Sequence, residues 1–409
     1  MLRAYALVYA ILVALMIAFF SSSILLLMYV NNKVNNLDNQ HLYKEQLLND
    51  GMSLFLEINY QYPYNQEIPY NLYNEDKSRI SFLKKQFGLY DVLIVKLENE
   101  PNLYRAAIVG KKPIGVLTAA LYLSDNFRPL VLTGTTKIRG DILIPKNGIQ
   151  QGYLDGIPYY SKELYIGKQA NSNNSLPDIQ INIIKNMYNM QVKETINKFA
   201  VDSIKNSYVK NSIVYYFDNS VVVQNVILKN NCMILSKQKI KIRKNTHLEN
   251  CIVVAPSIEI EEGTVGSLQL FATDTISLGE NVCLNYPSVV CMSGNRQESY
   301  LDINENVKIY GEVYSICPIQ FRTGFLPHFE IKKNAKITGC CYAEGNSKIN
   351  GIIFGTLFAN QFVYNSPQSI YINYLHNAII DVTSRNSNFV FSNVVSPTQN
   401  LSTVLQWVN

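Results

Sequence analysis

Lys239-Ile240-Lys241-Ile242 is the first of five short segments in which polar and apolar residues alternate. The other four are Ser257-Ile258-Glu259-Ile260, Thr275-Ile276-Ser277-Leu278, Tyr300-Leu301-Asp302-Ile303 and His328-Phe329-Glu330-Ile331. Alternation with a period of two places the apolar side chains on one face of a β-strand. Each segment is therefore predicted to be a short strand with one buried face.

A residue that favours a bend follows each segment, and these residues are Asn245, Gly263, Asn281, Asn306 and Asn334. Asn and Gly tolerate the positive φ that a tight bend requires. The first two steps, from Asn245 to Gly263 and from Gly263 to Asn281, are both 18 residues long. The later steps are longer, because polar or proline-containing stretches at 293–299 and 318–327 are inserted. Such a recurring apolar pattern is typical of stacked coils of strands.

A second apolar strand is expected in each repeat, at 251–255, 268–272, 289–292, 313–317 and 339–343. One such repeat cannot bury its apolar face alone, so each repeat must pack on its neighbours. The pattern predicts a mainly β fold, a parallel β-helix (solenoid). We favour a right-handed coil because strict hexapeptide repeats are absent from the sequence. The alternative is a β-sandwich in which the spacing is coincidental.

The chain begins with an almost unbroken apolar run from Ala4 to Val30, interrupted only by Ser21-Ser22-Ser23. A helix of this length spans a bilayer with some tilt. The alternative is a cleaved signal peptide, but Ile24-Leu25-Leu26-Leu27-Met28 follows the serines, where a cleavage site would be expected. We therefore predict a retained signal anchor, with residues 4–30 in contact with lipid. Arg3 weakly favours a cytoplasmic amino end and a periplasmic or extracellular position for the bulk of the chain.

Residues 1–33 form the predicted transmembrane helix and residues 34–135 a small α+β domain. In that domain we expect an amphipathic helix over 35–57, weakened by Gly51, and a second helix over 75–87 with Asn74 as its N-cap. Strands are expected at 90–97, 104–109, 115–123 and 129–133.

The rest of the chain is assigned to the solenoid. Residues 136–230 are predicted to start it, with a first repeat at 136–145 and a loop and helical insertion that includes 176–208. Residues 231–365 form its main part, and residues 366–409 a C-terminal cap. In that cap, 401–408 is expected to cover the last repeat, whose open edge would otherwise invite pairing.

The composition excludes some partners and leaves others open. Only 16% of the 409 residues are charged and the formal net charge is +5. No basic stripe with interleaved aromatic residues occurs, so a nucleic-acid partner is not expected. The seven cysteines, between Cys232 and Cys341, show no CxxC spacing. They are interpreted as small buried apolar residues, and one or two disulfides remain an alternative outside the cytoplasm.

The outward positions of the first strands carry Lys241, Glu259, Ser277, Asp302 and Glu330. Polysaccharide lyases and glycosidases with β-helical folds use carboxylates on such a surface. A mixed column of basic, hydroxyl and acidic side chains is more typical of a solvated face and makes a poor metal site. The sequence therefore predicts no catalytic, cofactor-binding or metal-binding residues, and the chain is not expected to be an enzyme.

The first hundred residues resemble the pilin and pseudopilin families in layout. A short basic start, an apolar helix that continues as an amphipathic one and a small sheet carry this resemblance. The start Met1-Leu2-Arg3-Ala4-Tyr5 departs from those families, because it lacks a Gly-Phe-type cleavage site followed by an early Glu. The repeats are similar in style to bactofilin-like and other polymer-forming solenoids.

Together these features suggest a bacterial envelope protein that is a structural or scaffold component of a surface, secretion or pilus-like assembly. Its partners would be proteins of that assembly or further copies of itself. The alternative is a β-helix that binds or cleaves a polysaccharide.

Overall fold

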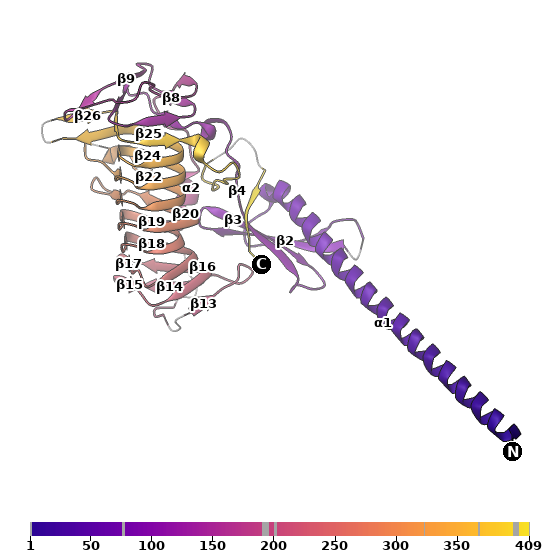
Figure 1. The fold of residues 1–409 in the computed structure, drawn as a ribbon. Helices are drawn as coiled ribbons and strands as arrows, with labels where there is room; N and C mark the ends of the chain where they lie inside the picture. The colour runs from indigo at the N-terminus through magenta and orange to yellow at the C-terminus, as the bar shows by residue number, and fades with distance from the viewer. Residues whose placement is uncertain are drawn as a thin grey trace. The chain divides into compact units, whose positions relative to one another are not determined.

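The structure is a computed structural model that describes residues 2–75, 78–189, 196–199, 203–322, 324–366, 369–395 and 401–408. It contains one long N-terminal helix and a mostly β body (Figure 1). The residues group into two compact units. Unit 1 comprises 1–55, 67–82 and 95–105, and unit 2 comprises 56–66, 83–94 and 106–409.

Helix α1 (Leu2–Ile58) is continuous over 57 residues. Almost every side chain from Leu7 to Leu42 is exposed. Its most apolar 18-residue window has a mean hydropathy of 2.6 and no buried residue. The helix is therefore long and apolar enough to cross a membrane.

The last turns of α1 in unit 1 pack on strand β2 (Arg79–Phe87). Leu47, Met52 and Phe55 are buried, and the ring of Phe55 stacks on that of Phe82 with a centroid distance of 4.4 Å. Gly51, expected to weaken the helix, lies where the helix and the strand approach most closely. A Cβ at this position would lie 2.6 Å from Cδ1 of Ile80.

The helix expected over 75–87 is wrong: residues 79–87 form strand β2, and residues 76–77 lie outside the described part of the chain. The apolar spacing of Ile80, Leu83 and Phe87 fits a helix as well as a strand that is buried on both faces. The deciding signal is Gly88, which has a φ of 61° and starts a two-residue turn into β3 (Tyr90–Leu97). Glycine at the first position of such a turn is typical of a β-hairpin.

Five strands form one sheet in the order β1-β2-β3-β4-β29. The remaining members are β1 (Glu67–Asn71), β4 (Tyr104–Gly110) and β29 (Thr403–Trp407). Strands β3 and β4 confirm the strands expected at 90–97 and 104–109. The expected strand at 115–123 is instead a 3-10 turn (Gly115–Thr118) followed by β5 (Leu121–Leu123).

The body of unit 2 is a closed, predominantly parallel sheet, which we call the stack (Figure 1). Its central strands are β16 (Ile227–Ser236), β17 (Lys239–Ile242), β18 (His247–Ile260), β19 (Val265–Leu278), β20 (Cys283–Ser293), β21 (Tyr300–Ile303), β22 (Lys308–Ile316), β23 (Phe329–Ile331), β24 (Lys336–Ile349) and β25 (Ile352–Asn365).

The five alternating segments pair in parallel with one another in the expected register. Ile240 lies opposite Ile258, and the same column continues through Ile276, Leu301 and Phe329. The ten apolar side chains of the five segments are each at most 1% exposed. The expected buried column is therefore present.

Four of the five expected bend residues have a positive φ. Gly263 has a φ of 70°, Asn281 and Asn306 of 58°, and Asn334 of 60°. Asn245 is not among the residues with positive φ. The prediction that Asn and Gly form bends with positive φ is therefore confirmed from Gly263 onward.

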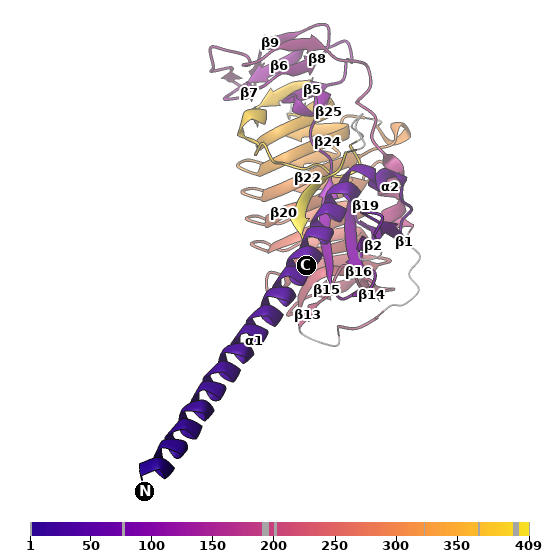
Figure 2. The ribbon, with the colours of Figure 1, turned by 90° about the vertical axis from the view of Figure 1, so that its right-hand side faces the viewer.

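The stack does not follow the order of the sequence. Residues 136–145 were expected to begin it, but β5 pairs with β25 and β7 (Lys137–Arg139) pairs with β28 (Ile379–Asp381). β8 (Ile142–Ile144) follows β5, and β12 (Gln169–Asn171) follows β8. These early strands therefore lie at the far end of the stack, beyond β25, where Figure 2 shows them.

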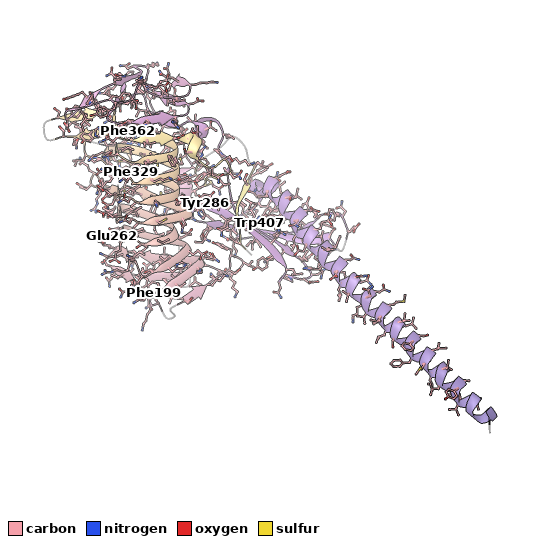
Figure 3. All side chains as sticks on the ribbon, viewed as in Figure 1. Phe199, Glu262, Tyr286, Phe329, Phe362 and Trp407 are labelled. Atoms are coloured by element: carbon pink, nitrogen blue, oxygen red, sulfur yellow. The ribbon has the colours of Figure 1, made fainter. Side chains whose placement is uncertain are left out.

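The opposite end is formed by β13 (Ser203–Lys205) and β14 (Ile213–Phe217), which both pair with β16, and β15 (Val221–Val223), which pairs with β17. Phe199 packs on the rings of Tyr215 and Phe217 with centroid distances of 4.6 and 5.4 Å. Figure 3 labels Phe199 at this end, with Phe329 and Phe362 at successive levels above it.

The segment between β12 and β13 runs back along the stack. The hydroxyl of Tyr342, in β24, donates to the carbonyl of Pro177 at 3.0 Å. Tyr188, at the end of α2 (Ile181–Tyr188), donates to the carbonyl of Ala272 in β19 at 3.1 Å. The amide of Ile196 then donates to the carbonyl of Val214 in β14 at 2.9 Å. Helix α2 lies within the expected insertion at 176–208, of which 190–195 and 200–202 are outside the described residues.

Smaller strands complete the fold. Strands β27 (Tyr374–His376), β6 (Leu130–Thr133) and β9 (Ile149–Gln151) form one sheet, and β10 (Tyr153–Leu154) pairs with β11 (Ile157–Pro158). β26 (Ile370–Ile372) pairs antiparallel with β25.

The expected role of residues 401–408 as a cover for the last repeat is wrong. Strand β29 pairs antiparallel with β4, with Thr403 opposite Gly110 and Trp407 opposite Ala107. The far end of the stack is already covered by β5, β7 and β8. Strand β29 instead pairs with the backbone groups along the edge of β4.

A column of three glycines marks one bend of the stack. Gly311 lies opposite Gly339, which lies opposite Gly355. A Cβ at Gly311 would lie 1.8 Å from the carbonyl oxygen of Ser288, and at Gly339 1.9 Å from that of Gly311. No side chain fits at this bend without separating adjacent strands.

Replacing Gly311 with Ala is therefore expected to lower the free energy of unfolding by more than about 2 kcal/mol. Urea denaturation of the full chain in detergent, followed by circular dichroism, measures this difference. The control is Lys308→Ala, which removes an exposed side chain from the same strand. Equal unfolding midpoints for the two variants would contradict the close approach at this bend.

Candidate functional site

The expected outward column of side chains is continuous across the stack. Lys241 lies opposite Glu259 and Ser277 opposite Asp302, and Glu330 follows in the same column. The structure thus brings together all five residues singled out from the sequence.

Basic side chains neutralise the acids of this column. Glu259 accepts from Lys239 and Lys241, each at 2.5 Å. Lys332 lies 3.0 Å from Asp302, and Lys348 lies 2.8 Å from Glu330. Partly exposed ion pairs of this kind each contribute about 0–1 kcal/mol to stability. Their main consequence is a surface on which each acid of the column is paired with a lysine.

Asp302 and Glu330 are neighbours whose pKa values shift in opposite directions. Burial raises the pKa of Asp302, although Lys332 opposes this shift. Burial also disfavours the charged form of Glu330, but hydrogen bonds from Lys348 and Tyr300 outweigh it and lower the pKa of Glu330. Two carboxyl groups with diverging pKa values can divide acid and base roles. Here each is held by its own lysine, which favours a structural ion-pair network.

A second surface feature is a cleft of about 350 Å³ on β7 and the loop at 161–166. Its basic side chains are Lys137, Arg139 and Lys162, and Glu163 and Tyr165 also line it. The three basic side chains are exposed, and within the described ranges no salt bridge joins them to an acid. The cleft, which we call the basic cleft, therefore presents positive charge beside a tyrosine ring.

Sequence reasoning missed the basic cleft. The alternation of Lys137-Ile138-Arg139 was recognised as strand pattern, and it places both basic side chains on the outer face. Lys162 is brought to them by the loop that returns beside β7, where the amide of Ile166 donates to the carbonyl of Ile138 at 3.0 Å. That loop carries no periodic signal.

Glu312 is a fully buried carboxylate between the stack and the segment at 385–395. Tyr90 donates to it at 3.2 Å, and the hydroxyl of Ser392 donates at 2.7 Å. Tyr314 and the amide of Ser392 are further donors. Burial raises the pKa of Glu312, although these hydrogen bonds oppose the shift.

A second buried polar group lies in unit 2 around Lys84 and Asp91. Their side chains are 3.4 Å apart, and Tyr64 donates to Asp91 at 3.1 Å. Burial raises the pKa of Asp91, with Lys84 opposing, and burial lowers the pKa of Lys111 nearby. The Lys111 ammonium lies 3.3 Å from Oγ of Ser402 just before β29. A buried ion pair with further hydrogen bonds fixes one arrangement of these strands.

The cysteines lie mostly in the interior. Six of the seven are buried and Cys283 is half-buried. Cys232 and Cys251 are opposite one another in adjacent strands. Within the described ranges, no group of three or more His, Cys, Asp or Glu side chains could hold a metal ion.

Comparisons with protein-family models, with curated proteins and with solved structures find no match to this chain.

The raised pKa of Glu312 predicts a pH-dependent stability. The folded-state pKa lies above the unfolded value of 4.5, so the stability contributed by Glu312 is complete below that value and is lost as the pH rises through the folded-state pKa. Glu312→Gln is expected to reduce the loss of stability in the pH range above 4.5. Denaturant unfolding of the full chain across this range measures it.

The control for this prediction is Glu262→Gln, which changes an exposed side chain labelled at the edge of the stack in Figure 3. This variant should keep the pH profile of the unaltered protein. A Glu312→Gln profile that also matches the unaltered protein would show that Glu312 ionises normally.

Proposed function

We propose that this chain is a single-span envelope protein that presents a parallel β-helix outside the cytoplasm. In this proposal it is a structural or scaffold component of a bacterial surface, secretion or pilus-like assembly. The observation that carries it is α1, whose exposed apolar part is joined without a break to a segment that packs in unit 1.

The dimensions of α1 support the membrane part of the proposal. Residues 4–30 would extend over about 40 Å as a helix, which is enough for a hydrocarbon core of about 30 Å. Burial in unit 1 starts only at Leu47. The helix thus has an apolar part for lipid and a polar part that would stand in water.

The register of the stack supports the interpretation as a parallel β-helix, for which we retain the right-handed form. Ser257 lies opposite Lys239, and Thr275 lies opposite Ser257, so the chain returns to the same place after 18 residues. Each time the chain returns, it adds one more layer of apolar side chains to the buried column. A sandwich would divide its strands between two separate sheets that pack face to face, whereas here the parallel pairing continues through one closed sheet.

A scaffold role is favoured by the outward column of paired charges. Its acids are held by lysines from neighbouring levels, so they stiffen a regular face rather than converge on a substrate. A regular surface of paired acidic and basic side chains suits protein partners of complementary charge.

The topology predicts that residues beyond the span are accessible from outside the cell. Glu280→Cys places a thiol at an exposed bend, and the half-buried Cys283 is replaced by Ser to reduce background labelling. A membrane-impermeant maleimide is expected to label this variant in spheroplasts, while the Cys283→Ser parent stays unlabelled. Labelling only after lysis would place the stack in the cytoplasm.

The scaffold part is tested in the same cells with a photo-crosslinking residue at Ser277, on the outward column. The expected product is a conjugate with an envelope protein or with another copy of the chain. A free chain, despite surface labelling of Glu280→Cys, would contradict the scaffold role and leave the membrane topology intact.

The basic cleft favours a second candidate function, binding of an acidic polysaccharide. Three cations beside Tyr165 suit a sugar carboxylate or sulfate together with stacking of the ring. Arg139→Gln is expected to weaken binding to an acidic glycan array by about tenfold, because a charge-assisted contact is lost. Lys146→Gln, an exposed neighbour outside the cleft, is the control. Equal binding by both variants, or release of reducing ends by the unaltered protein, would contradict binding at this cleft as the function.

A further inference from the structure

The polar part of α1, residues 31–42, is a helix without a packing partner in the described chain. Every side chain from Asn31 to Leu42 is exposed. Five of these residues, 31, 32, 35, 36 and 39, are asparagines, which form helices poorly. Helical stability in proteins comes mainly from packing of one face. A continuous helix here therefore calls for a partner outside the chain.

A narrow apolar seam on this helix indicates where the partner packs. Leu27, Val30, Val34 and Leu37 follow one another at steps of three and four residues, and they are 69, 49, 47 and 56% exposed. This is the a/d spacing of a coiled coil, with Val34 at an a position and Leu37 at a d position. Between 31 and 41, Val34 and Leu37 are the only apolar residues.

The charges beside the seam identify the geometry of the partner. With Val34 at a, Lys33 occupies a g position and Asp38 the following e position. Residues five apart do not face one another on a single helix. In a parallel pair of helices, however, a g residue faces the e residue five positions further along the other chain. Lys33 and Asp38 would then form two symmetric ion pairs between copies.

We infer that a second copy of this chain packs along this seam as a parallel two-stranded coiled coil. The inference rests on the proposed single span, because a shared membrane orientation makes copies parallel. In the part of the seam beyond the apolar span, the β-branched Val34 at a and Leu37 at d favour two strands. The complementary charges of Lys33 and Asp38 match the same sequence in the partner, so no other protein is needed to satisfy them.

Cysteine crosslinking in native membranes tests the seam. In the Cys283→Ser background, Val34→Cys and Leu37→Cys are expected to form disulfide-linked dimers on mild oxidation. Asn32→Cys and Asn39→Cys occupy f positions on the opposite face and should crosslink at least fivefold less. Equal crosslinking at all four positions, stronger crosslinking at the f positions or none would overturn the inference.

A charge exchange tests the parallel register. In the Val34→Cys background, Lys33→Asp and Asp38→Lys alone each place like charges opposite one another and should reduce dimer yield. The double variant Lys33→Asp/Asp38→Lys is expected to restore it. A double variant as poor as the single ones would exclude the g-to-e pairing, and conjugates with a different protein would exclude a second copy as the partner.

Surface labelling of Glu280→Cys separates this inference from the proposed function. Labelled chains that fail to crosslink at Val34 would refute the dimer and leave the single-span topology standing. Chains without external labelling that still crosslink would refute the external position of the stack and leave the dimer standing, because copies that share either orientation of the span are parallel.

Discussion

Parallel hydrogen bonding between successive levels is the constraint on which the rest of the structure depends. Because the register places like positions opposite one another, one alternating pattern becomes a continuous apolar column inside and a continuous polar column outside. Ile242, Ile260 and Leu278 lie in one such column. A slip of one residue would turn the apolar side chains outward, so the buried column and the register maintain each other.

The same constraint explains the bends and the order of the strands. Where successive levels turn, the backbone of one lies against that of the next, and Gly311, Gly339 and Gly355 leave room for this approach. An edge of paired strands accepts any strand of suitable pattern, so β5, β7 and β8 can complete the end beyond β25 although they come early in the chain. Because β12 and β13 lie at opposite ends of the stack, the segment between them, which contains α2, runs back along the stack.

Elements with a periodic apolar pattern are predicted from the sequence, whereas features that depend on contacts between residues far apart in the chain are not. The column from Ile240 to Phe329 and the apolar helix follow from local spacing. The apolar residues of Arg79–Phe87 fit both the helical and the strand period, so the prediction of a helix there is wrong. The position of Lys137–Arg139 beside Ile379–Asp381, and the burial of Glu312 against Ser392, arise from contacts across the chain. For the candidate surfaces, the outward column was predictable, whereas the basic cleft required a loop without periodic signal.

These features support the proposal of a membrane-anchored body that acts through its surfaces. The exposed seam of α1, the outward column and the basic cleft are three separate places at which partners could be held. The helix holds the side chains of the seam, and the register of the stack holds those of the outward column and the basic cleft, so both of these surfaces depend on the strand order.

The most direct test of that order is a comparison of two cysteine pairs in the folded chain. Lys137→Cys with Ile379→Cys joins positions that lie opposite one another in β7 and β28. Lys137→Cys with Ser203→Cys joins positions in strands at opposite ends of the same column, which would be neighbours if the strands stacked in sequence order. A short bismaleimide, which reacts with one thiol at each end, is expected to join residues 137 and 379, and mass spectrometry of the linked peptides identifies the product. A link between residues 137 and 203, with none between 137 and 379, would contradict the strand order.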